Sequence, residues 1–358
     1  MNSSVSEYLK TKVAIVGAGP FGLELAVALK RHGIRFEIFD SGAIGQTISW
    51  WAPGTRWFSS NERIAIAGVP LLTPNQAKAT REEYLTYLCS VARQFDIHVR
   101  NYEPVVEINL RHPGFTVVTK WQDAGRETQC EAVVLAVGGL DRARKLGIEG
   151  EDLPHVDGYL RELHRYYGRK VLIVGGRNSA VEAALRLYHA GAEVSLSYRG
   201  EQLPQDHIKY WLLPEIQGLI RSGQITAYFT TSPVRITPSH VMLQPGDTKG
   251  TAGEKVVEAE EVLTLIGYEQ DKTLLHAAGV DLVGDAQRPQ YDPETMETNV
   301  PGLYVGGTAV AGTQSSSYKI FLENCHQHVD QILAHMTGQS PAATDEEFKR
   351  QIKAAPES

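Results

Sequence analysis

A glycine-rich turn between two apolar runs limits the folds open to this chain. Residues 13–16 are apolar and lead into the turn from Gly17 to Gly22, which opens a helical pattern. A second apolar run, residues 36–39, ends on Asp40. A strand, glycine turn, helix and strand followed by an acidic residue form the dinucleotide-binding βαβ unit. This predicts a pyrophosphate at the helix N-terminus, where unpaired N–H groups attract anions, and a ribose hydrogen-bonded to Asp40.

The pattern recurs further along the chain with two changes. Residues 171–174 lead into the turn from Gly175 to Ala180, and the next apolar run ends on Arg199. An acid at this position selects a ribose 2′-hydroxyl, whereas an arginine binds a 2′-phosphate through paired hydrogen bonds. We therefore predict FAD or NAD at the first turn and NADPH at the second. The alternative for Arg199 is a solvated arginine without a ligand.

The second change is Arg177, which replaces the second glycine of the fingerprint. Glycine at this position lets the backbone approach the phosphates closely. The arginine side chain either blocks that approach or turns outward and binds the phosphates itself.

Two nucleotide sites in one chain imply electron or hydride transfer between two bound cofactors. The predicted fold is α/β, with two Rossmann-like, three-layer dinucleotide-binding domains, and 358 residues suffice for two such cores. Residues 1–150 and 267–338 are expected to form a discontinuous FAD-binding domain. An NAD(P)H-binding domain, residues 151–266, is expected to be inserted in it, and residues 339–358 to form a flexible tail.

Two more apolar runs end in glycine. Residues 132–137 precede Gly138 and predict a buried strand that joins the first domain's sheet beside the cofactor. Residues 262–268 predict another strand that returns to the first domain. Later, residues 299–308 predict a turn, a strand and a glycine pair, and a helix is expected to open at Ser315. Its N-terminus would stabilise negative charge on a reduced flavin.

The segment after Asp40 mixes aromatic and polar residues. Trp50, Trp51 and Trp57 are interleaved with Gly, Gln, Thr, Ser and Asn. That mixture suits a flat heteroaromatic ring with apolar faces and hydrogen-bonding edges, whereas packing in the core is the alternative. Residues 80–95 read as an amphipathic helix with a capping box between Thr80 and Glu83.

Composition excludes several classes of function. A net charge of −7 and a pI near 6.0 give no reason to expect nucleic acid or an anionic membrane as a partner. The three cysteines, widely spaced and without a C-x-x-C, predict neither a disulfide framework nor a metal site, and they fit the cytoplasm. Cys89 is expected in the core of its helix, and Cys130 and Cys325 are expected to be inert, with Cys325 two turns into its helix.

The paired fingerprints, the strand ending in two glycines and the late sequence from Gly302 to Gly307 resemble the thioredoxin-reductase-like FAD/NADPH oxidoreductases. Within that group the chain is most similar to the bacillithiol disulfide reductases. The stretches that carry this likeness are residues 56–64, 166–170, 178–184, 209–211 and 291–304.

The resemblance implies non-covalent FAD, NADPH as the donor, a homodimer or homotetramer, and reduction of a low-molecular-weight disulfide. The chain departs from the group in three ways. Phe21 stands where members commonly carry a cysteine, the C-x-x-C of thioredoxin reductases is absent, and Thr308 follows Gly307 where an aspartate usually holds the flavin side chain. The electrons are therefore expected to pass from the flavin directly to the acceptor, a small molecule or a small protein.

Two other functions stay open. One is a ferredoxin- or flavodoxin-NADP reductase or a flavin monooxygenase, enzymes of related fold that also lack redox cysteines. The other is a nucleotide-binding protein without turnover, because fold does not fix function.

No catalytic side chain is predicted, since the flavin holds the electrons. The residues predicted to bind FAD are Gly17, Gly19, Pro20, Phe21, Gly22, Asp40, Ser41, Gln46, Thr47, Trp57, Phe58, Ser59, Gly138, Gly307, Thr308, Tyr318 and Lys319. Those predicted to bind NADPH are Gly175, Gly176, Arg177, Asn178, Ser179, Ala180, Tyr198 and Arg199.

Overall fold

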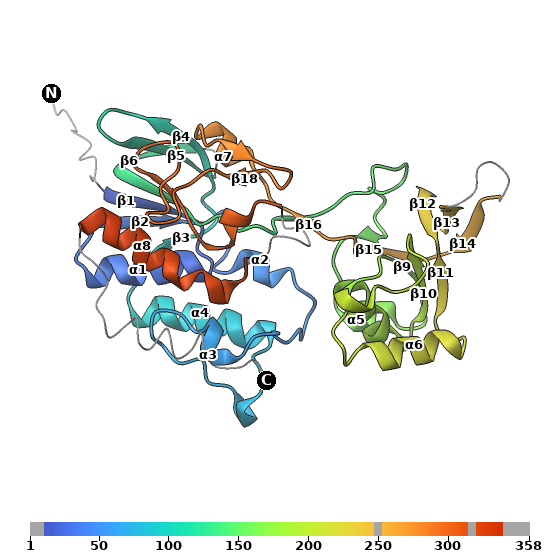
Figure 1. The fold of residues 1–358 in the computed structure, drawn as a ribbon. Helices are drawn as coiled ribbons and strands as arrows, with labels where there is room; N and C mark the ends of the chain where they lie inside the picture. The colour runs from blue at the N-terminus through green and yellow to red at the C-terminus, as the bar shows by residue number, and fades with distance from the viewer. Residues whose placement is uncertain (1–10, 123, 247–252, 314–319, 339–358) are drawn as a thin grey trace. The chain divides into compact units, whose positions relative to one another are not determined.

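The computed structural model describes residues 11–122, 124–246, 253–313 and 320–338 (Figure 1). The chain divides into two compact units, each of which contains one of the predicted βαβ units. The first unit contains the chain up to Trp50, Gly54–Asp141, and the chain from Glu269 onward. The second unit contains Trp51–Pro53 and Arg142–Tyr268.

The first unit is built around one sheet, in which the described residues place seven strands in the order β3-β2-β1-β6-β5-β4, with β19 also on β6. β1 runs parallel to β2 and β6, whereas β5 is antiparallel to β4 and β6. The strands are β1 (Thr11–Val16), β2 (Phe36–Phe39), β3 (Val99–Arg100), β4 (Val105–Leu110), β5 (Phe115–Trp121), β6 (Ala124–Leu135) and β19 (Leu303–Val305). The strand predicted before Gly138 is thus confirmed as the end of β6, beside β1.

Helix α1 (Pro20–Arg31) begins directly after the first glycine turn. Pro20 suits the first helical position because its fixed φ matches the helix and no partner exists there for an N–H. α1 contacts both α4 (Arg81–Gln94) and α8 (His326–Thr337), as Figure 1 shows. The apolar stripe of α1 is fully buried and comprises Leu23, Leu25, Ala26 and Leu29. The shorter helices of this unit are α2 (Gln46–Ser49), α3 (Asn61–Ile64) and α7 (Thr273–Ala277).

The capping box predicted for α4 is confirmed. The backbone N–H of Glu83 donates to the Thr80 hydroxyl at 3.2 Å, and the Glu83 carboxylate accepts from the Thr80 N–H at 2.7 Å. The expectation that Cys89 lies in the core is wrong, because its side chain is exposed. Leu88 and Tyr84 occupy the buried face, and a helix turns by about 100° per residue, which carries Cys89 away from that face.

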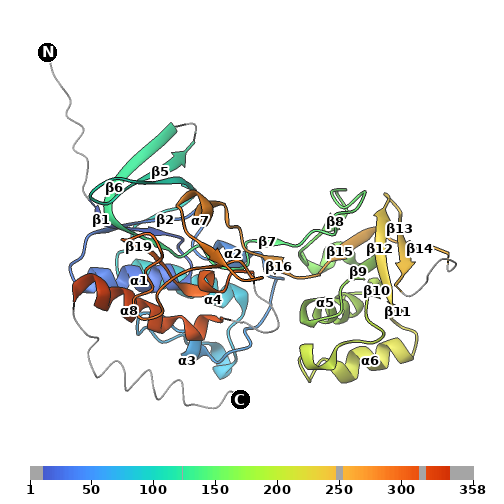
Figure 2. The ribbon, with the colours of Figure 1, turned by 45° about the horizontal axis from the view of Figure 1, so that its top comes forward.

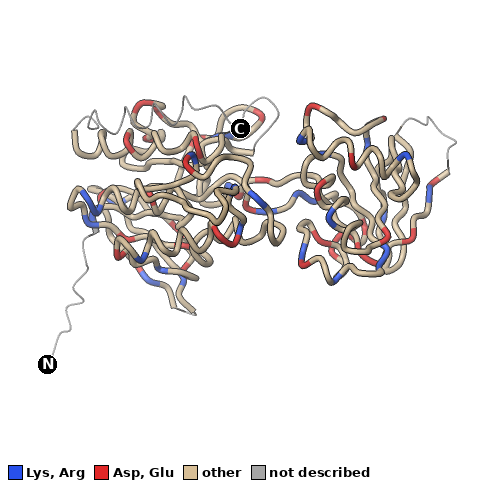
Figure 3. The backbone as a smooth tube through the Cα atoms, turned by 90° about the horizontal axis from the view of Figure 1, so that it is seen from below, with Lys and Arg blue, Asp and Glu red and all other residues tan. Residues whose placement is uncertain are grey.

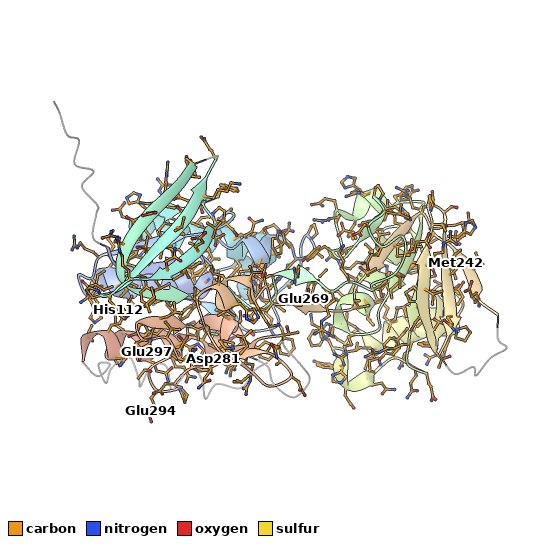
Figure 4. All side chains as sticks on the ribbon, turned by 90° about the horizontal axis from the view of Figure 1, so that it is seen from above. His112, Met242, Glu269, Asp281, Glu294 and Glu297 are labelled. Carbon is orange, nitrogen blue, oxygen red and sulfur yellow. The ribbon has the colours of Figure 1, made fainter. Side chains whose placement is uncertain are left out.

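Strand β19 follows a turn held by Glu297, whose carboxylate accepts a hydrogen bond from the N–H of Gly302 at 2.7 Å (Figure 4). β19 pairs in parallel with β6, and the chain continues into a 3₁₀ turn, Gly307–Ala311. The turn, strand and glycine pair predicted over residues 299–308 are therefore present.

The second unit contains a fully parallel sheet in the order β11-β10-β9-β15-β8. Its helices and the antiparallel β12-β13-β14 sheet are visible in Figure 2, and Met242 marks β13 in Figure 4. The elements are β8 (Val156–Asp157), β9 (Lys170–Val174), α5 (Asn178–His189), β10 (Glu193–Tyr198), α6 (Leu213–Arg221), β11 (Thr226–Phe229), β12 (Thr231–Ile236), β13 (His240–Pro245), β14 (Lys255–Glu258) and β15 (Glu261–Thr264).

Alternating side chains of β9 divide the second unit into three layers. Val171 and Ile173 pack into the apolar cluster with α5 and α6, whereas Leu172 and Val174 pack into the cluster with β12–β14. Successive residues of a strand point to opposite faces, so a strand covered on both faces is apolar throughout. The parallel sheet is therefore the middle layer of this unit.

The apolar run over residues 262–268 does not form a strand of the first unit. Its first part is β15, which pairs with β9 and β8 in the second unit, and the chain reaches the first unit only after Tyr268. An apolar run followed by glycine describes a buried parallel strand of either sheet, and the pattern alone does not say which.

Acidic and basic residues are interspersed along the chain of both units (Figure 3). No helix in the described ranges has the length and apolar character that crossing a membrane requires. Over the same ranges, no group of His, Cys, Asp and Glu is placed to hold a metal ion.

Candidate functional site

Two glycines of the first turn are required because backbone atoms pack against them, whereas the third borders a space that no protein atom fills. A Cβ atom at Gly17, where φ is +112°, would overlap the carbonyl oxygen of Ala136, and one at Gly22 would overlap the carbonyl oxygen of Gly17. Gly19 differs, because its φ is −73° and a Cβ there would meet no protein atom within 4 Å. This free space lies at the N-terminus of α1, where it fits the pyrophosphate of a dinucleotide.

Asp40 is held in place beside the same turn. Its carboxylate accepts hydrogen bonds from the N–H of Ala18 at 2.7 Å and from the N–H of Gly42 at 2.8 Å. Burial raises the pKa of the Asp40 carboxyl, and these two hydrogen bonds offset part of the shift. A carboxylate has about four acceptor positions, so two are left for the hydroxyls of a ribose.

The predicted residues just after Asp40 lie next to this turn. Ser41 is exposed, and Gln46 and Thr47 begin α2. The N–H of Gly45 donates to Ala18 O at 3.2 Å, which ties the start of α2 to the turn. The backbone here brings Gln46 and Thr47 close to the proposed pyrophosphate site.

The side chains of Trp57, Phe58 and Ser59 lie in three different environments. The half-buried Trp57 ring lies on Tyr84 of α4, with ring centroids 4.5 Å apart. Phe58 is exposed, and the buried Ser59 donates to the Glu323 carboxylate at 2.6 Å. Trp57 thus packs against the buried Tyr84, and its contact with a flavin ring stays a prediction.

A buried glutamine joins the two glycine segments of the first unit, and sequence reasoning missed it. The amide nitrogen of Gln270 donates to Gly138 O and to Ala309 O, both at 2.9 Å. The carbonyl oxygen of Thr308 sits so close to Gly139 that a Cβ atom there would lie 2.9 Å from it. Gln270 therefore fixes the spacing between the predicted FAD residues Gly138 and Thr308.

Phe21, which stands where the resemblance implies a cysteine, is a core residue. Its ring lies against the backbone of Gly306, where a Cβ atom would overlap it, and it also touches the position of a Cβ on Gly307. The edge of the ring faces His328 of α8, with centroids 6.2 Å apart. Phe21 is thus enclosed between the first turn, the glycine pair and α8.

His328 accepts a hydrogen bond from the N–H of Gly307 through Nδ1, at 3.2 Å. Burial, and to a smaller extent the neighbouring His326, lower the pKa of His328 to about 4. The imidazole is therefore neutral at neutral pH, which a ring nitrogen that accepts from a backbone N–H requires.

This histidine predicts an acid-sensitive fold. The pKa is 6.5 unfolded and about 4 folded, so the unfolded state binds the proton more tightly and stability falls as pH drops through this window. We expect the free energy of unfolding to fall by about 2 kcal/mol from near pH 7 to near pH 5. Urea unfolding at both pH values measures it. His328→Gln, which keeps an acceptor for Gly307, should remove most of the loss, and an unchanged pH dependence would contradict the assignment.

The helix predicted to open at Ser315 does not run unbroken to His326. Ser315, Tyr318 and Lys319 lie outside the described residues. Among those that are described, Leu322–Asn324 form a 3₁₀ turn and α8 starts at His326, so the expectation of one continuous helix is wrong. Phe321 is extended, with φ −109° and ψ 165°, and this interrupts any helix across it.

Cys325 consequently lies at the N-terminus of α8 rather than two turns inside a helix. Its thiol is buried and donates to Phe321 O at 3.1 Å, and burial raises its pKa well above the ordinary value. Burial also raises the pKa of the Cys130 thiol to about 12. Neither cysteine forms a reactive thiolate at neutral pH, which agrees with the prediction that both are inert.

The second turn has the same close packing at its first glycine as the first turn, but exposed polar and charged side chains surround it. Gly175 has φ +142°, and a Cβ there would lie 2.5 Å from Leu265 O. The ring of Tyr198 lies on Gly176, so a Cβ at Gly176 would overlap it. Arg177 is the N-cap of α5 and is exposed, as are Ser179 and Arg199. The structure therefore brings the predicted NADPH residues together at the carboxyl edge of β9 and β10.

Asn178 has a structural part that the sequence did not indicate. Its side-chain oxygen accepts from the N–H of Lys209 at 2.7 Å, and Lys209 Nζ lies 3.3 Å from the Glu182 carboxylate. These contacts fasten residues 209–211 to the first turns of α5. Lys209 is therefore paired within the second unit.

Comparison with known proteins agrees with this geometry. The family model for pyridine nucleotide-disulphide oxidoreductases matches residues 14–307. The bacilliredoxin reductase Bdr of Bacillus subtilis is 32% identical over 92% of this chain and 98% of its own length. The ferredoxin–NADP reductase of Ignicoccus hospitalis is 26% identical over 82% of this chain and 88% of its own.

A solved structure gives the same result. The bacillithiol disulfide reductase Bdr of Staphylococcus aureus aligns with a TM-score of 0.84 and 31% identity, over 92% of this chain and 98% of that one. These findings confirm the resemblance to bacillithiol disulfide reductases and the predicted two-domain α/β fold. The chain belongs to the pyridine nucleotide-disulphide oxidoreductase family.

Proposed function

We propose that this protein is an NADPH-dependent FAD oxidoreductase that reduces a low-molecular-weight disulfide of the bacillithiol type. The observation that carries the proposal is the pair of glycine turns, one beside Asp40 and the other beside Arg199, in a chain of this family. The name of the Staphylococcus aureus relative, bacillithiol disulfide reductase, supports the acceptor.

Each of the two units binds one of the two cofactors. The first unit, predicted as residues 1–150 and 267–338 but ending at Asp141 and resuming at Glu269, holds FAD, with pyrophosphate at Gly19 and ribose at Asp40. The second unit, predicted as residues 151–266 but extending over Arg142–Tyr268, holds NADPH at the turn from Gly175 to Ala180. When bound, the flavin supplies the redox chemistry, taking a hydride from the nicotinamide and passing two electrons to the acceptor.

No cysteine of this chain is placed to relay those electrons. Phe21 fills the position beside the last glycine of the first turn, Cys130 and Cys325 are buried with raised pKa values, and Cys89 is on the outer face of α4. The disulfide must therefore meet the flavin directly. In balance, one NADPH and one proton convert one disulfide into two thiols and NADP⁺. Without a protein thiol there is no mixed disulfide between enzyme and substrate.

An acceptor panel tests the proposal. The holoenzyme is reduced with NADPH without oxygen, and its reoxidation is followed with bacillithiol disulfide, glutathione disulfide, ferredoxin and oxygen in turn. We expect bacillithiol disulfide to reoxidise the flavin fastest, with two thiols formed per NADPH. Ferredoxin as the fastest acceptor would instead favour the ferredoxin–NADP reductase, which the Ignicoccus relative and the absence of a flavin-side thiol support. A protein that takes up no FAD would favour the non-catalytic alternative.

The exposed cysteine gives a second prediction. Iodoacetamide should label Cys89 alone in the folded protein and all three cysteines after unfolding, because the other two thiols are buried and protonated. Mass spectrometry counts the labels. We expect neither labelling nor Cys89→Ser to change the rate of disulfide reduction. A loss of that rate with unchanged flavin reduction by NADPH would show that a protein thiol takes part.

We further propose a cytoplasmic homodimer or homotetramer whose acceptor is a small molecule. The cysteine content and the resemblance support this assignment. Sedimentation of the holoenzyme measures the oligomeric state.

A further inference from the structure

The two glycine turns of this chain can be compared at the second glycine of the fingerprint, which is Gly19 in the first turn and is replaced by Arg177 in the second. Gly19 is the N-cap of α1, with φ −73° and ψ −177°, and Arg177 is the N-cap of α5, with φ −102° and ψ −171°. Both conformations are extended, and any residue adopts them. Arg177 therefore fits the second turn without strain. Its Cβ occupies the position that is equivalent to the open space beside Gly19 in the first turn.

No described residue of the second unit balances the charge of Arg177. The N-terminus of a helix carries a partial positive charge, so an arginine there is unfavourable. The first turn of α5 contains no acidic residue, and the Arg177 side chain makes no hydrogen bond or ion pair with any described residue. The nearest acid along the helix, Glu182, is paired with Lys209. A cation without a counter-ion at this end of α5 suits an anionic ligand.

Arg199 lies at the same edge of the sheet. The N–H of Gly175 donates to Ser197 O at 2.9 Å, and the ring of Tyr198, the next residue, covers Gly176. Arg199 follows Tyr198 and, like Arg177, is exposed and unpaired among the residues that the structure describes. Two uncompensated guanidinium groups thus flank the second turn, whereas the first turn has none and carries Asp40 instead.

We propose that Arg177 is a phosphate-binding residue that holds the NADPH pyrophosphate through its guanidinium. In the first unit, Gly19 lets the pyrophosphate approach the backbone N–H groups. In the second, the Arg177 side chain fills that space and replaces part of this contact with charge-assisted hydrogen bonds. Arg199 holds the 2′-phosphate, so the two arginines recognise different phosphates of one ligand. This inference rests on the proposed binding of NADPH by the second unit.

Binding by the FAD-loaded enzyme tests the assignment without turnover. The probes are NADP⁺, NAD⁺ and 2′-AMP, titrated by calorimetry into the wild type, Arg177→Gln and Arg177→Gly. We expect Arg177→Gln to weaken NADP⁺ and NAD⁺ alike, by about tenfold or more, and to leave 2′-AMP unchanged, because 2′-AMP has no pyrophosphate. Arg177→Gly should weaken both dinucleotides less, since it restores the backbone approach. Arg199→Ala should weaken NADP⁺ and 2′-AMP but not NAD⁺.

Other outcomes separate the possibilities. If Arg177→Gly binds both dinucleotides more tightly and Arg177→Gln binds them as the wild type does, the side chain only obstructs the turn and the proposal is overturned. A loss confined to NADP⁺ and 2′-AMP would place Arg177 on the 2′-phosphate instead and would also overturn it. Failure of the wild type to bind any of the three probes would refute the nucleotide site itself. Without nucleotide, Arg177→Gln should melt at the same temperature as the wild type or higher, which excludes misfolding as the cause.

Discussion

Gly19→Ala is expected to give a protein that folds normally but no longer retains FAD. The substitution adds one carbon where no protein atom lies within 4 Å, and the backbone is already in a conformation that alanine adopts. In the holoenzyme that carbon would lie between the pyrophosphate and the first N–H groups of α1. Loss of two charge-assisted hydrogen bonds weakens FAD binding by roughly a hundredfold or more. Flavin absorbance of the purified protein and calorimetric titration with FAD measure it.

Gly22→Ala is the matched comparison at the same turn. Its Cβ would overlap the carbonyl oxygen of Gly17, so the backbone must shift even without cofactor. We expect this variant to lose about 3 kcal/mol of folding stability in the apoprotein, as overpacking does, whereas apo Gly19→Ala unfolds with the wild type. If Gly19→Ala keeps its FAD, the open space at this turn is not the pyrophosphate site. If the two apoprotein variants lose folding stability equally, Gly19 is packed as closely as Gly22 and does not border an open space.

The sequence predicts best those structural features that depend on residues close together along the chain. The strand, turn and helix around Gly17 and the capping box at Thr80 each occupy a short stretch, and periodicity with local hydrogen bonding determines them. The contrast between Asp40 and Arg199 is likewise a matter of spacing along the chain. Such features could be predicted without coordinates.

Contacts between distant segments could not be predicted in this way. The hydrogen bond from Ser59 to Glu323 joins residues 264 positions apart, and Gln270 reaches Gly138 across 132 positions. No local pattern marks either contact. The same limit explains the error over β15, because an apolar run records burial on both faces but not the sheet that provides it.

The helix expected to run unbroken from Ser315 to His326 fails for a different reason. The residues of this segment contain few helix breakers, so propensity alone predicts one continuous helix. In the structure, the extended Phe321 stops it, and Glu323 is drawn to Ser59. Tertiary contacts thus override local preference, as they also do for Phe21, whose role as packing for Gly306 and Gly307 is visible only in the fold.

Arg199→Ala should erase the preference of the enzyme for NADPH over NADH. The exposed guanidinium is unpaired in the described part of the chain and follows the strand that lies beside the second turn, the position from which a 2′-phosphate is bound. A bidentate guanidinium–phosphate pair is worth about 1.5–3 kcal/mol, so NADPH binding should fall by roughly ten- to a hundredfold. NADH lacks that phosphate and should bind as before.

Anaerobic stopped-flow reduction of the flavin measures this, with the rate taken as a function of each nucleotide concentration. Arg199→Lys is the matched control, because it keeps the charge but not the paired geometry, and it should retain part of the preference. Since Arg177 holds the pyrophosphate common to both nucleotides, Arg177→Gln should slow NADPH and NADH together at limiting concentrations. Equal rates with both donors in the wild type would remove the basis for assigning Arg199 to the 2′-phosphate. Substitution of Arg199 should therefore change the preference for NADPH over NADH, whereas substitution of Arg177 should weaken the binding of both nucleotides. Both results together are expected only if the two arginines contact different phosphates.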